Sequence, residues 1–188
     1  VKRKKEKIIA KKYKHKFGLF HGRFQHLHLG HQKIIDKMLS ECEEAILLVG
    51  ECQSYGSKRN PFNILDRIDL IKRIYGNNKR LTIGFFPDLY NIPKTEKEYS
   101  EWGNWIISFC QFYAQKIPDV VYGGSETKLE WIYKNYKVKF EKIDRDDISA
   151  TQLREYLLRG NKSAWQKITD PKIHSRFSYL RKVVSKIR

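Results

Sequence analysis

The sequence predicts an α/β fold: an open parallel sheet with helices on both faces and a helical C-terminal segment. Two observations support this prediction. Short apolar runs recur along the chain and are bounded by glycine or proline, as is typical of strands buried on both faces of a sheet. Stretches with apolar residues at helical spacing separate these runs, with short connections between them. Such Rossmann-like sheets bind ligands beyond the carboxyl ends of their strands.

The first strand–helix–strand unit is expected within residues 17–50. Residues 17–22, Phe-Gly-Leu-Phe-His-Gly, form a short apolar run that ends in glycine and predicts a buried strand. Residues 30–39 have an apolar helical face, and the apolar run 45–50 predicts the second strand. The apolar residues of the helical face are Ile34, Ile35, Met38 and Leu39.

The middle of the chain continues the alternation. Asn60-Pro61 marks the entry to a helix that Gly76 can end, and residues 81–86 predict the third strand. The polar residues 88–101 are expected to form a loop before an aromatic helix at 102–116.

The last third of the chain predicts two more strands, at 119–122 and 138–143, with a helix near 128–135 between them. Residues 149–152, Ser-Ala-Thr-Gln, match a capping box that opens a helix, and Gly160 can close it. The remaining residues predict further helix.

Charge is concentrated at the two ends of the chain. The net charge is +17; residues 1–16 hold nine of the 38 Lys and Arg, and residues 171–188 hold six. We therefore expect residues 1–16 to be a basic tail and residues 17–188 to be one domain with a helical C-terminal end. Because the excess charge lies in the tails, nucleic acid is not expected as the main partner.

Composition also predicts where the protein is located. Apolar runs fall short of the roughly 20 residues that span a bilayer, and the charged start differs from a signal peptide. We expect a cytoplasmic protein without a membrane partner. The three cysteines lack metal-ligand or redox spacing, which favours reduced thiols over zinc sites or disulfides.

A phosphate site is expected where the first strand passes into the first helix. His28 and His31 lie there, and a helix N-terminus offers unpaired N–H groups and a positive dipole end. Gly22 permits a tight turn after the strand, and Gly30 a close approach of the backbone to a ligand. A metal site on the histidine pair is the alternative, but no carboxylate or thiol has suitable local spacing.

Four segments give the chain a family resemblance. Residues 22–31, Gly-Arg-Phe-Gln-His-Leu-His-Leu-Gly-His, resemble the Gly-Arg-Phe-Gln-Pro-x-His-x-Gly-His signature of the nucleotidyltransferase superfamily. Residues 50–67, with Gly-Glu-Cys-Gln and Asn-Pro-Phe, resemble the segment after the second strand in archaeal-type nicotinamide-nucleotide adenylyltransferases. Asp88 and Trp105 resemble that family's nicotinamide pocket, and residues 148–154 resemble its Ile-Ser-Gly-Thr-x-x-Arg motif.

The resemblance implies transfer of AMP from ATP to the 5′-phosphate of a mononucleotide, most simply nicotinamide mononucleotide (NMN). That phosphate is already anionic, so no strong general base is required, and Mg²⁺ would accompany ATP. The implied catalytic residues are Arg23, His28, His31 and Arg154. The implied ATP-binding residues are Gly22, Arg23, Phe24, His28, Gly30, His31, Gly123, Ser149, Thr151 and Arg154. The implied acceptor-binding residues are Gln53, Asn60, Asp88 and Trp105, and no metal-ligating residue is implied.

Several of these roles have structural alternatives. Ser149 can be only a helix cap, Trp105 can be a core residue of an aromatic helix, and Arg23 can be an exposed arginine. Three departures from the family pattern bear on the acceptor more than on the reaction. They are His26 in place of proline, Glu51 in place of a small residue and Ala150 in place of glycine.

The same phosphate-binding residues could serve other functions. The acceptor could be nicotinate mononucleotide, a phosphopantetheine or the substrate of a cytidylyl transfer. A non-catalytic, nucleic-acid-associated protein with working basic tails is a further alternative, against which His28, His31 and Arg154 argue. A homo-oligomer is expected.

Overall fold

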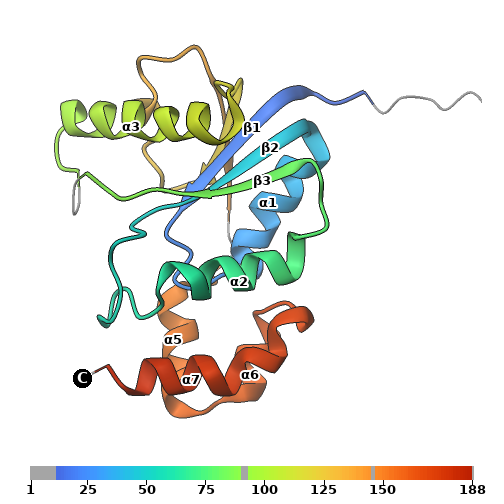
Figure 1. Ribbon diagram of the computed structural model, residues 1–188, viewed down its shortest axis with the longest axis vertical. Helices are drawn as coiled ribbons and strands as arrows, with labels where there is room; N and C mark the ends of the chain where they lie inside the picture. The colour runs from blue at the N-terminus through green and yellow to red at the C-terminus, as the bar shows by residue number, and fades with distance from the viewer. Residues whose placement is uncertain (1–11, 90–92, 145–146, 188) are drawn as a thin grey trace, which may run out of the picture.

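Five parallel strands form one sheet in the order β3-β2-β1-β4-β5. The computed structural model describes residues 12–89, 93–144 and 147–187. Figure 1 shows β1, β2 and β3 side by side through the middle of the molecule. The chain moves outward from β1 in one direction and returns to β4 on its other side, so the order reverses between β1 and β4. The strands are β1 (His15–Gly22), β2 (Cys42–Val49), β3 (Leu81–Phe85), β4 (Val120–Gly124) and β5 (Lys139–Ile143).

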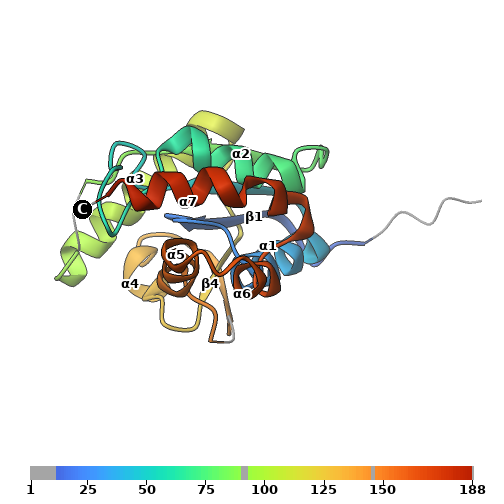
Figure 2. The same ribbon diagram turned by 90° about the horizontal axis from the view of Figure 1, so that it is seen from below.

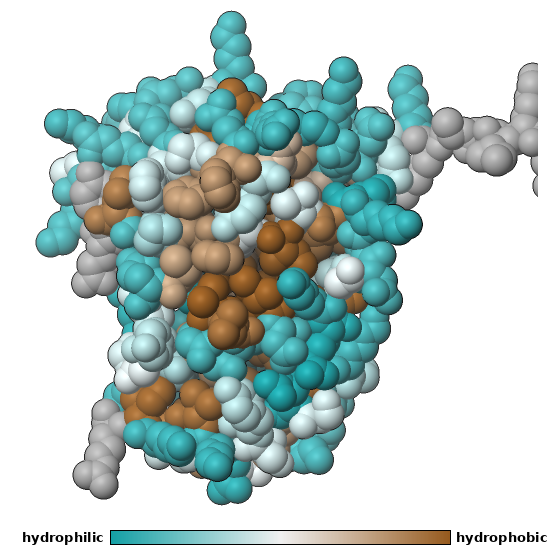
Figure 3. Space-filling model, in the orientation of Figure 1, coloured by the Kyte–Doolittle hydropathy of each residue, from teal (hydrophilic) through white to brown (hydrophobic). Residues whose placement is uncertain are grey.

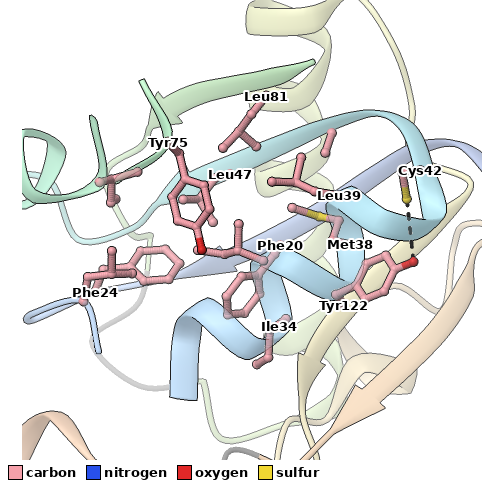
Figure 4. Packing of buried hydrophobic residues seen from close by; sticks show 14 of the residues in the cluster. Phe20, Phe24, Ile34, Met38, Leu39, Cys42, Leu47, Tyr75, Leu81 and Tyr122 are labelled. Atoms are coloured by element: carbon pink, nitrogen blue, oxygen red, sulfur yellow. Dashed lines mark hydrogen bonds between the residues drawn. The ribbon is translucent and has the colours of Figure 1, made fainter. Parts of the chain in front are cut away.

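Helices cover both faces of this sheet. Phe20 in β1 packs with α1 (Leu29–Glu41) and α2 (Ile64–Tyr75). Leu19, the preceding residue, packs on the opposite face with α3 (Glu96–Ala114) and α4 (Leu129–Ile132). Figure 1 shows α3 above the strands and α2 below them, and Figure 4 shows Phe20 among the side chains of the α1 face. Burial on both faces explains the continuous apolar run of β1 and confirms the predicted fold class.

The C-terminal segment forms a third apolar layer beneath α2. Trp165 is fully buried at its centre and packs with Phe62, which precedes α2. Figure 2, seen from below, shows α5, α6 and α7 lying in front of the sheet. The predicted closure of α5 by Gly160 is confirmed, because this residue has a φ of +69°, which glycine adopts without strain. The elements are α5 (Ala150–Arg159), α6 (Lys162–Lys167), the 3₁₀ helix η1 (Pro171–Arg176) and α7 (Phe177–Ser185).

Several predicted boundaries are wrong, among them the entry to α2, whose N-cap is Asn63 rather than Asn60. The expected loop 88–101 ends early, because α3 begins at Glu96 and Thr95 forms a capping box with Glu98. The Thr-x-x-Glu pattern of residues 95–98 is the local signal for this helix start. In addition, β1 begins at His15, so its first two residues come from the segment expected to be a basic tail. Residues 1–11 and 90–92 lie outside the described residues.

Two absences concern only the described ranges. None of their helices combines the length and apolar composition that crossing a bilayer requires. Cys42, Cys52 and Cys110 all have free thiols.

Candidate active site

A cleft of about 490 Å³ opens beyond the carboxyl ends of the strands. Its walls come from the loop after β1, the start of α1, the ends of β2, β3 and β4, the side of α3 and the start of α5. This is the edge of the sheet at which ligands bind in open α/β folds. The lining includes these predicted site residues: Gly22, Arg23, Phe24, His28, His31, Asp88, Ser149, Thr151 and Arg154.

His28 is the N-cap of α1. Its Nδ1 accepts a hydrogen bond from the backbone N–H of His31 at 3.3 Å, so in the neutral ring the proton lies on Nε2. The side chain is 1% exposed and borders the cleft. The cap therefore prepares the Nε2–H to donate to a ligand placed at the helix N-terminus.

His31 lies in the first turn of the same helix, beside His28. The two ring centroids are 3.7 Å apart, and the His31 ring also packs edge-on against Phe24 at 4.9 Å. His31 is 7% exposed and borders the cleft. Such packing restricts the rotamers of both rings and orients their nitrogen atoms before a ligand arrives.

Arg154 brings a guanidinium from α5 to the same side of the cleft. It donates from Nη1 to the carbonyl of Gln25 at 2.9 Å and from Nη2 to the hydroxyl of Thr151 at 3.0 Å. Burial lowers the pKa of Arg154, and the positive charge of Arg23 lowers it further. The two guanidinium groups repel each other across the cleft. An anion bound between them would reduce this repulsion.

Ser149 acts as the N-cap of α5. Its hydroxyl accepts from the N–H of Gln152 at 3.2 Å, and Ser149 also lines the cleft. Its capping role and a ligand role are therefore compatible, since both belong to the same helix end. Ala150 follows it as the first residue of α5 and lines the cleft as well.

Asp88 and Trp102 define the other side of the cleft. The indole Nε1 of Trp102 donates to Oδ1 of Asp88 at 3.1 Å, and both residues line the cleft. Burial raises the pKa of Asp88 to about 6, and the nearby charge of Glu51 contributes to this rise. The Asp88 carboxyl group is thus mostly ionised at neutral pH. It becomes mostly protonated as the pH falls one to two units below neutral.

Trp105 lies outside the cleft lining. Its Nε1 donates to the carbonyl of Pro87 at 2.6 Å, and its ring packs edge-on against Phe109 at 5.1 Å. This placement matches the core alternative considered for Trp105. Trp102, one turn earlier on α3, occupies the position at which a flat base could stack.

Glu51 points into the cleft between two arginines. It is 6% exposed; its Oε1 lies 3.6 Å from Arg59 Nη2 and 3.9 Å from Arg23 Nε. Asn60 joins this group, because its Nδ2 donates to Glu51 and its Oδ1 accepts from Arg23. Asn60 itself does not line the cleft, so its role here is to position the charged pair.

Other predicted site residues also lie behind the lining. Gln53 forms two hydrogen bonds with the backbone of Asp88, at 3.3 and 3.4 Å, and so positions that residue. Gly30 is in the first turn of α1 and Gly123 is in β4; Gly124, the next residue, borders the cleft instead.

Arg67 supports the cleft from below. It is fully buried, and Nη1 donates to the carbonyls of Arg23 and Gly50 at 2.8 and 2.7 Å. Nη2 donates to the carbonyl of Glu51 at 3.0 Å. Burial lowers the pKa of Arg67 to about 10, so the guanidinium keeps its charge at neutral pH. This single side chain links the ends of β1 and β2 to α2.

His26 faces away from the cleft. Its Nδ1–H donates to the carbonyl of Leu27 at 2.7 Å, and its Nε2 accepts from the indole of Trp165 at 2.9 Å. Burial lowers the pKa of His26 to about 4, so the ring is neutral. The replacement of proline by His26 therefore adds no titratable group to the cleft, because this histidine links the loop to the C-terminal layer.

A model of the cytidylyltransferase-like family matches residues 19–156. The chain belongs to this family. It is 31% identical to the nicotinamide-nucleotide adenylyltransferase of Archaeoglobus fulgidus over 79% of the chain and 82% of that protein. It is also 31% identical to the enzyme of the same name from Methanococcus vannielii, over 75% and 77%.

A solved structure shares the fold of this cytidylyltransferase-like chain. It is a bifunctional NMN adenylyltransferase/ADP ribose pyrophosphatase from Francisella tularensis, with 18% identity and a TM-score of 0.69. The match covers 92% of this chain and 52% of that one, so the chain spans about half the length of that protein.

Some residues that line the cleft of this cytidylyltransferase-like protein had no predicted role. Arg59, Trp102 and Glu126 are three of these residues. The helical spacing of Trp102 and Trp105 did not separate a cleft position from a core position, since both lie on the sheet side of α3. Arg59 follows the second strand in a polar loop, and no pattern distinguished it from a solvated lysine or arginine.

Proposed function

We propose that this protein is a nicotinamide-nucleotide adenylyltransferase. An oxygen of the NMN 5′-phosphate attacks the α-phosphorus of ATP, a new P–O bond forms, and the bond between the α- and β-phosphates breaks. NAD and pyrophosphate are the products. The observation that carries the proposal is the meeting of His28, His31 and Arg154 at two helix N-termini on one side of the cleft.

Each of these groups has a defined task in the proposed reaction. His28 and His31 donate to the non-bridging oxygens of the α-phosphate, where negative charge increases in the transition state. Arg154 and Thr151 bind the phosphates that leave as pyrophosphate. Both lie at the start of α5, where they contact each other at 3.0 Å. Arg23 lies between the phosphate side and the acceptor side, so it can contact the phosphate that attacks.

The carboxylates of the cleft support an amide-bearing acceptor. Glu51, Asp88 and Glu126 line it. A carboxylate can accept from the carboxamide N–H₂ of nicotinamide, whereas it would repel the carboxylate of nicotinate mononucleotide. Trp102 offers its ring for stacking on the base, and its bond to Asp88 keeps both in position.

Mg²⁺ is proposed to enter with ATP. It prefers oxygen ligands and is usually held by substrate phosphates with one or two carboxylates, and the carboxylates of the cleft fit that requirement. When bound, the ion offsets the charge of the departing pyrophosphate.

We also propose a cytoplasmic homo-oligomer. Figure 3 shows apolar side chains gathered on the face that carries β3 and α3. Phe85 in β3 and Phe112 in α3 are 41% and 75% exposed, and β3 is an edge strand. A contact between copies would cover both features.

The function is tested with a panel of acceptors incubated with ATP and Mg²⁺. NMN, nicotinate mononucleotide and phosphopantetheine are compared by the formation of adenylylated product and pyrophosphate. We expect NMN to have the highest kcat/KM, and the Arg154→Ala variant to serve as the inactive control. Preference for another acceptor would contradict the proposal and leave the nucleotidyltransferase chemistry in place.

A further inference from the structure

A second cluster of ligand-type side chains lies at the end of the sheet opposite the cleft. His15 begins β1, Glu41 ends α1 and Glu141 lies in β5. One ring nitrogen of His15 and one carboxylate oxygen of each glutamate all lie within 4.8 Å of one another. Because a strand rises by about 3.3 Å per residue, the backbone of His15 at the start of β1 lies roughly 20 Å from Gly22, which borders the cleft at the other end of this strand.

His15 is the group that marks the cluster as a ligand site. The side chain is 5% exposed, and its Nε2 forms no hydrogen bond with any residue in the described ranges. Buried polar atoms in folded proteins almost always have a partner. A buried imidazole that has such a nitrogen and lies beside two carboxylates is an arrangement in which a cation can bind.

The two glutamates are held in place by neighbours. The hydroxyl of Tyr122 donates to Oε2 of Glu41 at 2.8 Å, and Lys37 lies 2.8 Å from Oε1. Tyr122 is itself fixed in the α1 face of the sheet, where its hydroxyl contacts Cys42 (Figure 4). Lys14 forms ion pairs with Glu141 and, at 3.7 Å, with Glu41. Outer contacts of this kind orient carboxylates that ligate metals.

We propose that His15, Glu41 and Glu141 bind a divalent transition metal, with Zn²⁺ as the best match. One imidazole and two carboxylates suit zinc, whereas Mg²⁺ and Ca²⁺ prefer oxygen ligands alone. Ligands at about 2.1 Å in a tetrahedral zinc site are about 3.4 Å apart. The present spacing, within 4.8 Å, therefore needs only side-chain adjustment to close on the ion.

Lys14 is the competing cation of this site. Its side chain is half exposed, so it can leave both carboxylates without disturbing the sheet. Bound zinc would replace the lysine charge between the two glutamates. Removing Lys14 should consequently strengthen zinc binding, an effect opposite to that of removing a ligand.

The site would cross-link three separate parts of the fold. Its ligands come from the central strand β1, the end of α1 and the edge strand β5. A ligand that binds only the folded state raises the unfolding temperature. Zinc should therefore stabilise the protein through this site independently of nucleotide binding and of the function proposed above.

The test uses the full chain without nucleotide, with zinc binding measured by equilibrium dialysis and thermal unfolding followed with and without Zn²⁺. The variants are His15→Ala, Glu141→Gln and Lys14→Ala. Glu43→Gln, a change of an exposed acid in β2, is the matched control. Mg²⁺ replaces Zn²⁺ in a parallel series.

We expect the wild type and Glu43→Gln to bind one zinc ion more than His15→Ala. Loss of one ligand should weaken binding by at least about tenfold, and Lys14→Ala should tighten it. The zinc-dependent rise in Tm should follow the same order and be absent with Mg²⁺. Equal zinc binding in the wild type, His15→Ala and Glu141→Gln would overturn the proposal. If His15→Ala does not fold, the partly exposed Glu141→Gln decides alone.

Discussion

The phosphate side and the acceptor side of the cleft are built in different ways. On the phosphate side, His28 and His31 belong to one helix turn, and Thr151 and Arg154 belong to another. On the acceptor side, Asp88 follows β3 and its partner Trp102 comes from α3. The first side is thus assembled from residues three apart, and the second from separate elements.

The difference predicts which side of the cleft tolerates change. A helix N-terminus presents N–H donors and its first-turn side chains in a fixed relation, so a short motif preserves the whole phosphate side. Glu51 departs from the family pattern on the acceptor side, where its charge is balanced by Arg23 and Arg59. Changes on this side should alter which acceptor binds rather than whether AMP is transferred.

The largest effect is expected for His31→Ala. Loss of one preorganised donor to the α-phosphate should lower kcat by about 10²- to 10³-fold, with a smaller change in the KM for ATP. Steady-state kinetics measure both constants. Because the ring also packs on Phe24, thermal unfolding must show that the variant is folded. A folded variant with turnover near that of the wild type would place the chemistry elsewhere.

The two tryptophans of α3 offer a matched pair on the acceptor side. Trp102→Phe removes the donor to Asp88 and should raise the KM for NMN by about tenfold, with the KM for ATP little changed. Trp105→Phe removes the bond to Pro87 and should mainly lower Tm, with the KM for NMN within about threefold of wild type. If Trp105→Phe raised the KM for NMN more than Trp102→Phe did, Trp105 would be the acceptor contact.

The titration of Asp88 predicts a pH dependence of acceptor binding. The pKa of Asp88 is raised to about 6, so the carboxylate that accepts from the carboxamide is lost as the pH falls through 6. The KM for NMN should rise by up to about tenfold per pH unit below that value. The phosphate of NMN also titrates near pH 6. Asp88→Asn is therefore the control, and its profile should retain only the substrate's own titration.

The same raised pKa has a consequence for stability. Burial disfavours the ionised form of Asp88 in the folded state, so the ligand-free protein is destabilised above pH 6 and not below pH 4. Asp88→Asn should therefore raise the unfolding free energy at pH 8 and leave it nearly unchanged at pH 4. Denaturant unfolding at the two pH values measures the difference, and an equal effect at both would contradict the assigned cause.

The smallest effect is expected for Glu51→Gln. The amide can still accept from Asn60, but the negative charge near Asp88 is gone, so the pH midpoint of the KM for NMN should shift downward. The KM itself should fall by about two- to fivefold at neutral pH, because both arginines become available to the acceptor phosphate. A midpoint that does not move would show that Glu51 does not influence Asp88.

The sequence by itself determined the alternation of strands and helices and the phosphate side of the cleft. Both depend on local spacing: buried runs between glycines predict strands, Ser149 is a preferred N-cap residue, and His28 and His31 lie three apart where the first buried run passes into a helical pattern. The start of α3 is equally local, because the Thr-x-x-Glu pattern at 95–98 forms a capping box.

Only the tertiary structure decided the acceptor side. Trp102 lines the cleft and Trp105 does not, and Glu51 lies between Arg23 and Arg59. His26 contacts Trp165, 139 residues away in the sequence. It also brought His15 to Glu41 and Glu141. Each of these contacts joins elements whose relative position follows from strand order and helix packing. Trp102 and Trp105 show that residues one helical turn apart can lie in the cleft and in the core. Local patterns carry no record of such positions, because they arise when the whole chain packs.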